Sequence, residues 1–326
     1  MNIFKNEIIT RVKFAGGYCN AHAHIDRAYT VNNFNLAQAQ RPLQEKWDIT
    51  RELKTNATVG GILYRMSQVV EDQIAQGVTS LTTFLDFDEY SEDKPYSAFQ
   101  QLKEIYKDRI NLYCCNQTLQ GLEDLESLKW FTKGSEVVDI LGSLPGRDKD
   151  KSRHMSIVFK MAKTLGKPVH MHVDQFSLPE EKETELALDK IEEYKLEGKV
   201  SLIHCLSLAC QPKEYRERQY SRMVSTETKV IACVTAWMDS KRSEVLVPFH
   251  SSTTPIDEMI EHGVSVSLGT DNISDITCPF STGDMFDEVK LVALTNRIYN
   301  IDTLVKLATN KDTLRRVYNG SNSHNR

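Results

Sequence analysis

The sequence predicts an α/β fold in which eight parallel strands alternate with helices and close into a (β/α)8 barrel, or TIM barrel. Eight short runs rich in β-branched and apolar residues recur along the chain, and their apolar character on both faces is typical of buried parallel strands. Amphipathic segments of helical period separate most of these runs. The 326 residues exceed the roughly 250 of a typical barrel, and no linker or low-complexity tract divides them. An open doubly wound sheet is the main alternative.

Each expected strand is placed by its apolar run and each expected helix by its period. The strands lie at about 17–25, 79–87, 110–117, 137–144, 168–174, 199–206, 229–236 and 264–271. The clearest helical segments between them lie at 60–77, 96–109, 151–166, 184–198 and 255–263. Several of these segments end in a glycine beside a strand, which indicates a helix C-cap followed by a tight turn. These glycines are Gly77, Gly166, Gly198 and Gly263.

The chain that follows the eighth strand predicts helices and no further strand. Residues 281–300 and 301–319 both show apolar residues at helical spacing. The last residues, 319–326, are small and polar and are expected to form a frayed tail. We therefore expect a single domain over 1–326, a barrel followed by C-terminal helices.

Composition favours a small-molecule partner. The chain has 40 Lys+Arg against 45 Asp+Glu, a net charge of −5, so it lacks the basic surface expected for nucleic acid or an anionic membrane. No segment approaches the roughly 18 apolar residues of a membrane span, and the first twenty residues show no signal-peptide core. The seven cysteines show no CxxC spacing. We expect a cytoplasmic protein with buried thiols and no disulfide, while a homo-oligomer remains open.

Polar residues gather where four of the expected strands end. His22 and His24 end the first strand, and their spacing points both side chains to the same side. His172 ends the fifth strand, His204 the sixth and Asp271 the eighth. In a barrel these ends meet at one mouth, where active sites are built. A lone His-x-His pair is more often structural, but four strand ends together favour a metal centre.

This set of ligands indicates which metal the centre would hold. Imidazole and carboxylate ligands suit one divalent transition metal, with zinc and iron(II) the first choices and manganese a further one. Such a metal lowers the pKa of a bound water to about 7 and so supplies hydroxide at neutral pH.

At these residues the sequence resembles the amidohydrolase superfamily, and within it the cytosine deaminase-like group, which includes enzymes that act on triazine rings. The motifs are His22-x-His24, "HVDQ", "IHCLS", "LGTDNISD" and "CPFSTGDM". The resemblance implies that His22, His24 and His172 are metal ligands. It implies that His204 stabilises the attacking water or the tetrahedral intermediate. Asp271 would contact the metal and transfer the proton of the nucleophile.

The sequence departs from this group at a catalytic position. Cytosine deaminases carry a Glu three residues after the fifth-strand ligand, whereas this chain has Gln175, a neutral amide that cannot carry a proton. Either a nearby acid does the work, with Asp174, Glu183 and Glu185 as candidates, or the substrate needs no ring protonation. Asp174 is also a candidate substrate-binding residue. Gln117 resembles the substrate-amide glutamine of the group, although an ordinary strand-end role is equally compatible.

A second departure concerns the accessory domain. Members of the group usually add a small β-sandwich built from N-terminal and C-terminal segments, but only 21 residues precede His22 here. We therefore expect the barrel to lack the sandwich. Four further charged residues follow strand ends and are candidates for either substrate contact or structural salt bridges: Asp26, Arg27, Asp86 and Asp88.

These observations support one leading function and leave two alternatives open. The leading hypothesis is a metal-dependent amidohydrolase or deaminase that uses metal-bound hydroxide to hydrolyse a C–N bond of a small, cyclic, nitrogen-containing substrate. A cyclic amide or other carbonyl hydrolase would use the same site without a ring proton. A barrel that binds metal or ligand but has lost catalysis would also account for Gln175.

Overall fold

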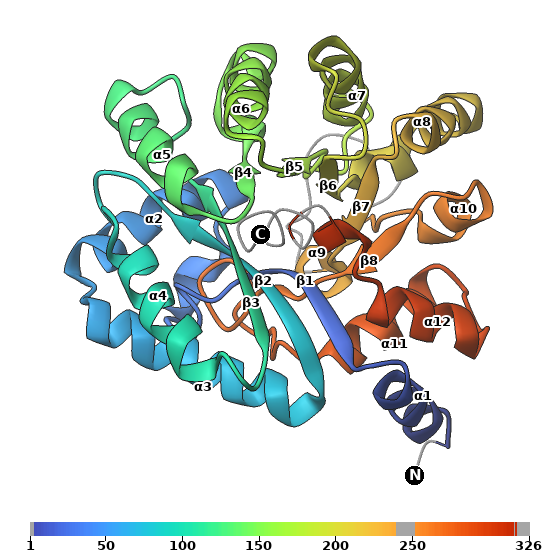
Figure 1. Ribbon diagram of the computed structural model, residues 1–326, viewed down its shortest axis with the longest axis horizontal. Helices are drawn as coiled ribbons and strands as arrows, with labels where there is room; N and C mark the ends of the chain where they lie inside the picture. Colours follow the sequence, from blue (N-terminus) through green and yellow to red (C-terminus); the bar gives the residue numbers. More distant parts are fainter. Residues whose placement is uncertain (1–2, 239–251, 316, 318–326) are drawn as a thin grey trace, which may run out of the picture.

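A ring of parallel strands surrounded by helices forms the fold (Figure 1). The computed structural model describes residues 3–238, 252–315 and 317. The strands are β1 (Tyr18–His24), β2 (Val78–Asp86), β3 (Asn111–Gln117), β4 (Leu141–Ser143), β5 (Val169–Val173), β6 (Val200–His204), β7 (Lys229–Ala232), β8 (Val266–Leu268) and β9 (Asp271–Asn272).

The strands are neighbours in chain order, as a (β/α)8 barrel requires. One ladder runs β3-β2-β1-β9 and the other β4-β5-β6-β7-β8, and every pairing is parallel. An isolated bridge between Cys115 and Ile140 connects β3 to the start of β4. On the opposite side only Gly269 and Thr270 separate β8 from β9, which pairs with β1. The two short strands therefore share the eighth position, and the barrel prediction is confirmed.

Helices cover the outside of the ring. Those of the described residues are α1 (Ile3–Phe14), α2 (Leu43–Asn56), α3 (Val59–Gln76), α4 (Lys94–Tyr106), α5 (Leu125–Val137), α6 (Lys151–Leu165), α7 (Glu183–Tyr194), α8 (Lys213–Ser225), α9 (Val234–Met238), α10 (Ile256–Glu261), α11 (Met285–Thr295) and α12 (Ile301–Thr309). The predicted helices correspond to α3, α4, α6, α7, α10, α11 and α12. The predicted tail at 319–326 lies outside the described residues.

Several boundaries differ from the prediction for local reasons. The expected strand 229–236 ends at Ala232, because the carboxylate of Glu288 accepts hydrogen bonds from the backbone N–H groups of Val234 and Thr235 at the start of α9. Gly77 and Gly166 are left-handed C-caps as expected. The helix before Gly198 ends earlier, at a left-handed Lys195.

The interior of the barrel is apolar. It contains Cys19, Ala21, Phe84, Cys115, Ile140, Ile203, Ile231, Cys233 and Leu314, all buried. Leu314 belongs to a short 3-10 helix, Asp312–Leu314, so the chain beyond α12 also contributes to this interior. All seven cysteines lie in the described residues, all are buried, and none forms a disulfide.

Two expectations from the sequence concern an accessory β-sandwich and membrane-spanning segments. Within the described residues every strand belongs to one of the two ladders of the barrel, and no further sheet is present. Among the helices described, none combines the length and apolar character needed to cross a membrane.

Candidate metal centre and active site

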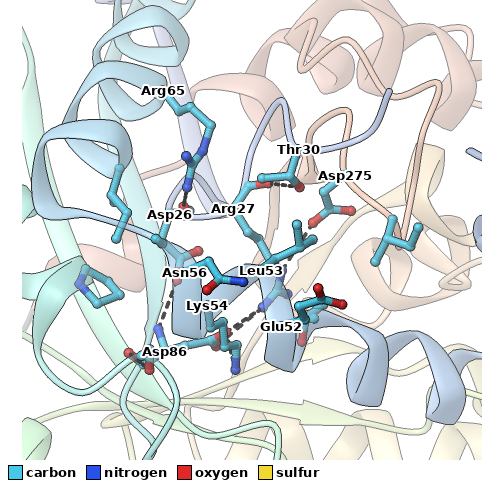
Figure 2. Close-up of a pocket in the computed structure, with 16 residues that line it drawn as sticks. Asp26, Arg27, Thr30, Glu52, Leu53, Lys54, Asn56, Arg65, Asp86 and Asp275 are labelled. Atoms are coloured by element: carbon cyan, nitrogen blue, oxygen red, sulfur yellow. Dashed lines mark hydrogen bonds and ion pairs between the residues drawn. The ribbon is translucent and has the colours of Figure 1, made fainter. Parts of the chain in front are cut away.

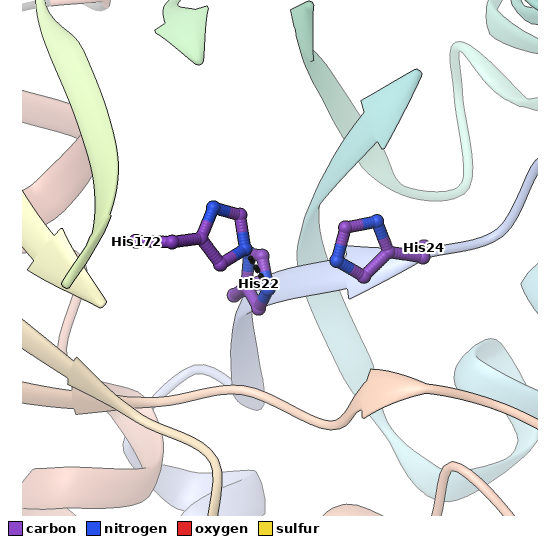
Figure 3. A group of neighbouring side chains, drawn as sticks. All are labelled: His22, His24 and His172. Atoms are coloured by element: carbon purple, nitrogen blue, oxygen red, sulfur yellow. Dashed lines mark hydrogen bonds between the residues drawn. The ribbon is translucent and has the colours of Figure 1, made fainter. Parts of the chain in front are cut away.

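The strand ends bring three histidines together at the mouth of the barrel (Figure 3). His22 and His24 come from β1 and His172 from β5, and their rings face a common point. Nε2 of His22 lies 3.3 Å from Nε2 of His172. Asp271, at the start of β9, adds a carboxylate whose Oδ1 lies 3.3 Å from Nε2 of His22 and 3.2 Å from Nε2 of His24.

These separations fit a metal ion. Zinc–nitrogen and zinc–oxygen bonds of about 2.0–2.2 Å in a tetrahedral site place neighbouring ligand atoms about 3.3–3.5 Å apart. The three measured separations of 3.2–3.3 Å between ring nitrogens and the Asp271 oxygen are close to that spacing. The donor set therefore suits a divalent transition metal, as the sequence predicts.

Hydrogen bonding fixes the tautomer of His172, and burial keeps His24 and His172 neutral. Nδ1 of His172 lies 3.0 Å from the carbonyl oxygen of Ser143, and a carbonyl can only accept, so the ring proton sits on Nδ1 and Nε2 is left unprotonated. Burial lowers the pKa of His24 to about 3 and the pKa of His172 well below its ordinary value. Both rings are therefore neutral at physiological pH.

Asp271 remains ionised despite its burial. Burial by itself would raise the pKa of this carboxyl, but the rings of His22 and His24 hold the pKa well below its usual range. Its backbone φ is +57°, a left-handed conformation at the start of β9. A carboxylate beside ligand nitrogens is placed to accept a proton.

His204 faces the same centre from the end of β6. Its Nε2 lies 3.7 Å from Oδ2 of Asp271, and its ring is buried. The backbone φ of His204 is +76°, and the hydroxyl of Thr254 donates a 2.6 Å hydrogen bond to its carbonyl oxygen. The indole N–H of Trp237, in α9, donates a 2.7 Å hydrogen bond to its Nδ1. His204 is thus held from both its backbone and its ring.

Gln117, at the end of β3, lies beside the centre. Its amide nitrogen is 3.3 Å from Nδ1 of His24 and donates a 2.7 Å hydrogen bond to Oδ1 of Asp86. Asp86 pairs with Arg27 at 3.2 Å and with Lys54 at 2.8 Å. Burial acts to raise the pKa of Asp86, but Lys54 and Arg27 outweigh it and lower the pKa. In the structure Gln117 therefore links His24 to a buried charge cluster.

The residues proposed to replace the missing acid occupy three different environments. Oδ1 of Asp174 accepts a 2.7 Å hydrogen bond from the backbone N–H of Glu183, so its carboxyl group faces the start of α7. Glu185 accepts from the hydroxyl of Tyr215 at 3.1 Å and faces α8. Glu183, the third candidate, and Gln175 both lie near Gly146. A Cβ at Gly146 would lie 3.6 Å from Oε1 of Glu183 and 3.7 Å from Nε2 of Gln175.

Gln175 is buried next to this carboxylate. Its side-chain nitrogen has no hydrogen-bond partner among the described residues. Glu183 forms an ion pair with Lys151, at the start of α6, so its charge is compensated. The amide of Gln175 is therefore available as a hydrogen-bond donor.

A cavity of about 340 Å³ lies next to the Asp86 cluster (Figure 2). Side chains of both charges line it, including Asp26, Arg27, Lys54, Arg65 and Asp275. Oδ1 of Asp26 is buried with no hydrogen-bond partner among the described residues. Burial and the nearby charge of Asp86 raise the pKa of Asp26 to about 6. The cavity thus suits a polar chemical group.

Helix α2 closes this side of the molecule. Trp47 packs against Leu119 and Leu144, which follow β3 and β4. Lys54 reaches Asp88 after β2, with a nitrogen–oxygen distance of 2.5 Å. Lys46 donates a 2.9 Å hydrogen bond to the carbonyl of Thr277 after β9. The helix is therefore anchored to loops at the same end of the barrel as the histidines.

Sequence reasoning missed three parts of this arrangement: α2, the Lys54–Asp86 pair and Trp237. Helix α2 is largely polar, and its two buried lysines, Lys46 and Lys54, resemble ordinary surface residues. Trp237 stands 33 positions from its partner His204. The nearest available signal was a Trp directly after the seventh strand, at the active end of the barrel.

The fold and the site define a class of protein: a (β/α)8 barrel with a His/Asp cluster that could hold a metal at the carboxyl ends of its strands. The model of the amidohydrolase family matches residues 14–311. The chain belongs to the amidohydrolase family. This membership confirms the expected enzyme class, a hydrolase of C–N bonds other than peptide bonds.

Individual relatives agree with this assignment. An uncharacterised protein of Haemophilus influenzae is 43% identical over 262 residues, which are 79% of this chain and 95% of that protein. The N-isopropylammelide isopropyl amidohydrolase of Pseudomonas sp. (strain ADP) is 24% identical over 82% of this chain, and the match spans 65% of its length. The structure of 5-methylcytosine deaminase from Klebsiella pneumoniae superposes with a TM-score of 0.85 at 17% identity, over 94% of this chain and 76% of that one.

Proposed function

We propose that the protein hydrolyses a C–N bond of a small, cyclic, nitrogen-containing substrate and releases ammonia or an amine. The observation that carries the proposal is the convergence of His22, His24, His172 and Asp271 at ligand spacing, with His204 beside them. The relatives named for a triazine-derived substrate and for a pyrimidine support the choice of a nitrogen ring. The net charge of −5 also favours a small molecule over nucleic acid as the partner.

His22, His24, His172 and Asp271 would hold one divalent transition metal, zinc or iron with manganese as a further candidate. When bound, such a metal lowers the pKa of water and polarises the bond under attack. Asp271, kept ionised by its surroundings, takes the proton of the nucleophile and delivers it to the leaving nitrogen. His204, on the other side of Asp271, stabilises the negative charge that develops on oxygen.

Gln175 and Glu183 shape the choice of substrate. A neutral amide with an unused donor hydrogen can bind a carbonyl oxygen or an unprotonated ring nitrogen, but it cannot protonate either. Glu183 lies near the same glycine, Gly146, and is paired with Lys151, so it is a candidate acceptor for a substrate N–H. We propose that the substrate presents an acceptor to Gln175. Asp174 supports this region through its bonds to α7.

A hydrolase of cyclic amides or other carbonyl groups is the second candidate. It is favoured by Gln175, because opening a lactam through attack on its carbonyl requires no protonation of a ring nitrogen before the attack. The same metal ligands and the same Asp271 would serve this reaction.

The cellular compartment and the type of partner are proposed from the composition of the chain and the burial of its cysteines. Seven buried cysteines without a disulfide fit a reducing compartment, which favours the cytoplasm. We propose a single barrel domain that acts on a small molecule without nucleic acid.

The test combines metal content with a substrate panel. Protein purified after growth with supplemented zinc, iron or manganese is expected to hold about one transition metal per chain. It is then assayed for ammonia or amine release from aminopyrimidines and aminotriazines and for ring opening of lactams. The Asp271→Asn variant should lose turnover while keeping its fold by circular dichroism. A wild-type protein without metal, together with an active His22→Ala, His24→Ala double variant, would overturn the proposal.

A further inference from the structure

The hydrogen bond between Trp237 and His204 determines where His204 carries its proton. An indole has one N–H, which donates and never accepts. Nδ1 of His204, 2.7 Å from Nε1 of Trp237, must therefore accept, and an accepting ring nitrogen carries no hydrogen. In a neutral imidazole the single proton then sits on Nε2. Nε2 is the atom that faces Oδ2 of Asp271 at 3.7 Å.

We propose that Trp237 is a positioning residue that fixes His204 as the tautomer protonated on Nε2, so that His204 acts as a hydrogen-bond donor to the reacting centre. The proposal rests on the proposed function for its catalytic meaning, but the tautomer itself depends only on the geometry. It assigns a role to α9, the short helix that carries Trp237.

The tautomer decides between two metal groupings that the side chains allow. His22, His24 and His172 form one group, and His22, His204 and Asp271 form another, each with ligand atoms within 4.8 Å of one another. A nitrogen that carries a proton has no lone pair in the ring plane to give to a metal. His204 bonded to Trp237 therefore cannot ligate through Nε2. In this tautomer the grouping that includes His204 is excluded.

The same bond keeps His204 from taking up a proton. An imidazolium carries N–H groups at both ring positions, so protonation at Nδ1 would place two N–H groups against each other across 2.7 Å. His204 is thus a neutral donor, and the moving proton is left to Asp271.

Other contacts fix the positions of α9, Trp237 and His204 relative to one another. Glu288, buried in α11, accepts hydrogen bonds from the backbone N–H groups of Val234 at 2.8 Å and Thr235 at 3.2 Å, and so fixes the start of α9. The rings of His204 and Trp237 meet edge to face, with centroids 4.8 Å apart. The hydroxyl of Thr254 fixes the backbone of His204. The indole is therefore oriented by its helix and by ring packing together.

The tautomer can be measured in the full-length protein by long-range ¹H–¹⁵N NMR with ¹⁵N-labelled histidine, with and without zinc. The resonances of His204 are assigned by their loss in His204→Asn. We expect an unprotonated, hydrogen-bonded Nδ1 and a protonated Nε2 in both samples. Because no substrate is used, this result stands or falls separately from the proposed reaction. A wild-type ring protonated on Nδ1 would overturn the inference.

The Trp237→Phe variant removes the N–H and keeps an aromatic ring against His204, and Trp130→Phe, on the distant helix α5, is the matched control. In Trp237→Phe the His204 resonances should shift towards a mixture of tautomers, while Trp130→Phe should leave them in place. Turnover should fall at least about tenfold with little change in KM, as losing the correct tautomer of a catalytic histidine does elsewhere. Unchanged His204 resonances in Trp237→Phe would overturn the proposal even if activity fell.

Discussion

The backbone at two residues of the candidate site is held in a conformation that most side chains avoid. His204 and Asp271 have φ values of +76° and +57°. Such left-handed residues cost roughly 1–3 kcal/mol each and persist where the surroundings fix them. For His204 the hydroxyl of Thr254 supplies part of that support.

Restoring an acid at position 175 should change the substrate preference. In Gln175→Glu the new carboxyl would lie buried beside Glu183, and burial next to another carboxylate raises a carboxyl pKa, so the group would hold a proton to donate. We expect the ratio of kcat/KM for aminopyrimidine deamination to that for lactam opening to rise at least about tenfold. The control is Gln68→Glu on the exposed surface of α3. An unchanged ratio in Gln175→Glu would contradict the role given to this position.

At the scale of single elements, α2 shows how a polar helix can be part of the structure around a site. Its buried residues are Lys46, Trp47, Thr50 and Lys54. Each lysine meets an oxygen from a distant loop, Lys46 at Thr277 and Lys54 at Asp86 and Asp88. A buried ammonium group is tolerated only with such partners. The position of α2 therefore depends on loops from other parts of the barrel.

Removing the single large apolar contact of α2 should loosen this helix first. Trp47 is 4% exposed, and truncating a buried tryptophan to alanine typically costs about 3–5 kcal/mol. In Trp47→Ala we expect faster hydrogen–deuterium exchange across 43–56 and little change in β5 and β6. Trp130→Ala on α5 is the comparison, since it should leave exchange in α2 unaltered. Equal acceleration throughout the barrel would show that α2 is no separate unit.

The loop before α7 should make stability fall as pH rises. Burial and the charge of Glu183 raise the pKa of Glu181 to about 7. The folded protein then retains a proton that the unfolded chain releases near its ordinary value. The stabilisation of the folded state by this proton is complete below about pH 4.5. It is lost as pH rises through about 7, and the loss reaches about 3 kcal/mol in the free energy of unfolding.

The Glu181→Gln variant tests this dependence. A glutamine oxygen can still accept from the backbone N–H of Phe176 and the hydroxyl of Ser207, but it cannot ionise. Urea unfolding between pH 4.5 and 8 should show a smaller decline for Glu181→Gln than for wild type. Glu180→Gln, at an exposed neighbour, should follow wild type. A decline that is identical in all three proteins would refute the assignment to Glu181.

Strands and helices differed in how far the sequence could predict them. The eight strand positions were confirmed because buried parallel strands are apolar on both faces, a signal carried by adjacent residues. Helices α3 and α6 were found through local period and the left-handed caps Gly77 and Gly166. Helix α2 carried no comparable signal, because its buried face contains lysines that pair with residues far along the chain.

The residues of the candidate site also differ in how far the sequence could predict them. The convergence of His22, His24, His172, His204 and Asp271 followed from barrel topology, which sends all strand ends to one mouth. The partners that orient these groups could not be predicted. The Ser143 carbonyl and the Trp237 indole contact their histidines through loop and helix geometry that no local pattern encodes.

At the scale of the whole molecule, the centre joins the two ladders of the barrel. His22, His24 and Asp271 belong to the four-stranded ladder, whereas His172 belongs to the five-stranded one. The ladders also meet through one isolated bridge, the short connection between β8 and β9 and the apolar interior of the barrel. A metal held by residues of both would therefore tie the halves together.

Metal removal should lower stability as well as activity. A ligand at a thousand times its Kd stabilises the folded state by about 4 kcal/mol, so stripping the protein with a chelator should lower Tm by roughly 5–10 °C. Differential scanning calorimetry before and after zinc readdition measures the change. The His22→Ala, His24→Ala variant serves as the control and should be insensitive to the chelator. An equal wild-type Tm before and after removal of the metal would show that the centre does not bridge the ladders.

The burial of the cysteines determines how the folded chain reacts with thiol reagents. All seven thiols are buried, and burial raises the pKa of the Cys19 thiol, inside the barrel, to about 12. Thiolates are the reactive species, so an alkylating reagent finds almost no target until strands separate. Cys19 lies in β1, Cys115 in β3 and Cys233 directly after β7, so they sample different parts of the interior. The order in which they become alkylated therefore records which sector of the barrel opens first, with no label added to the protein.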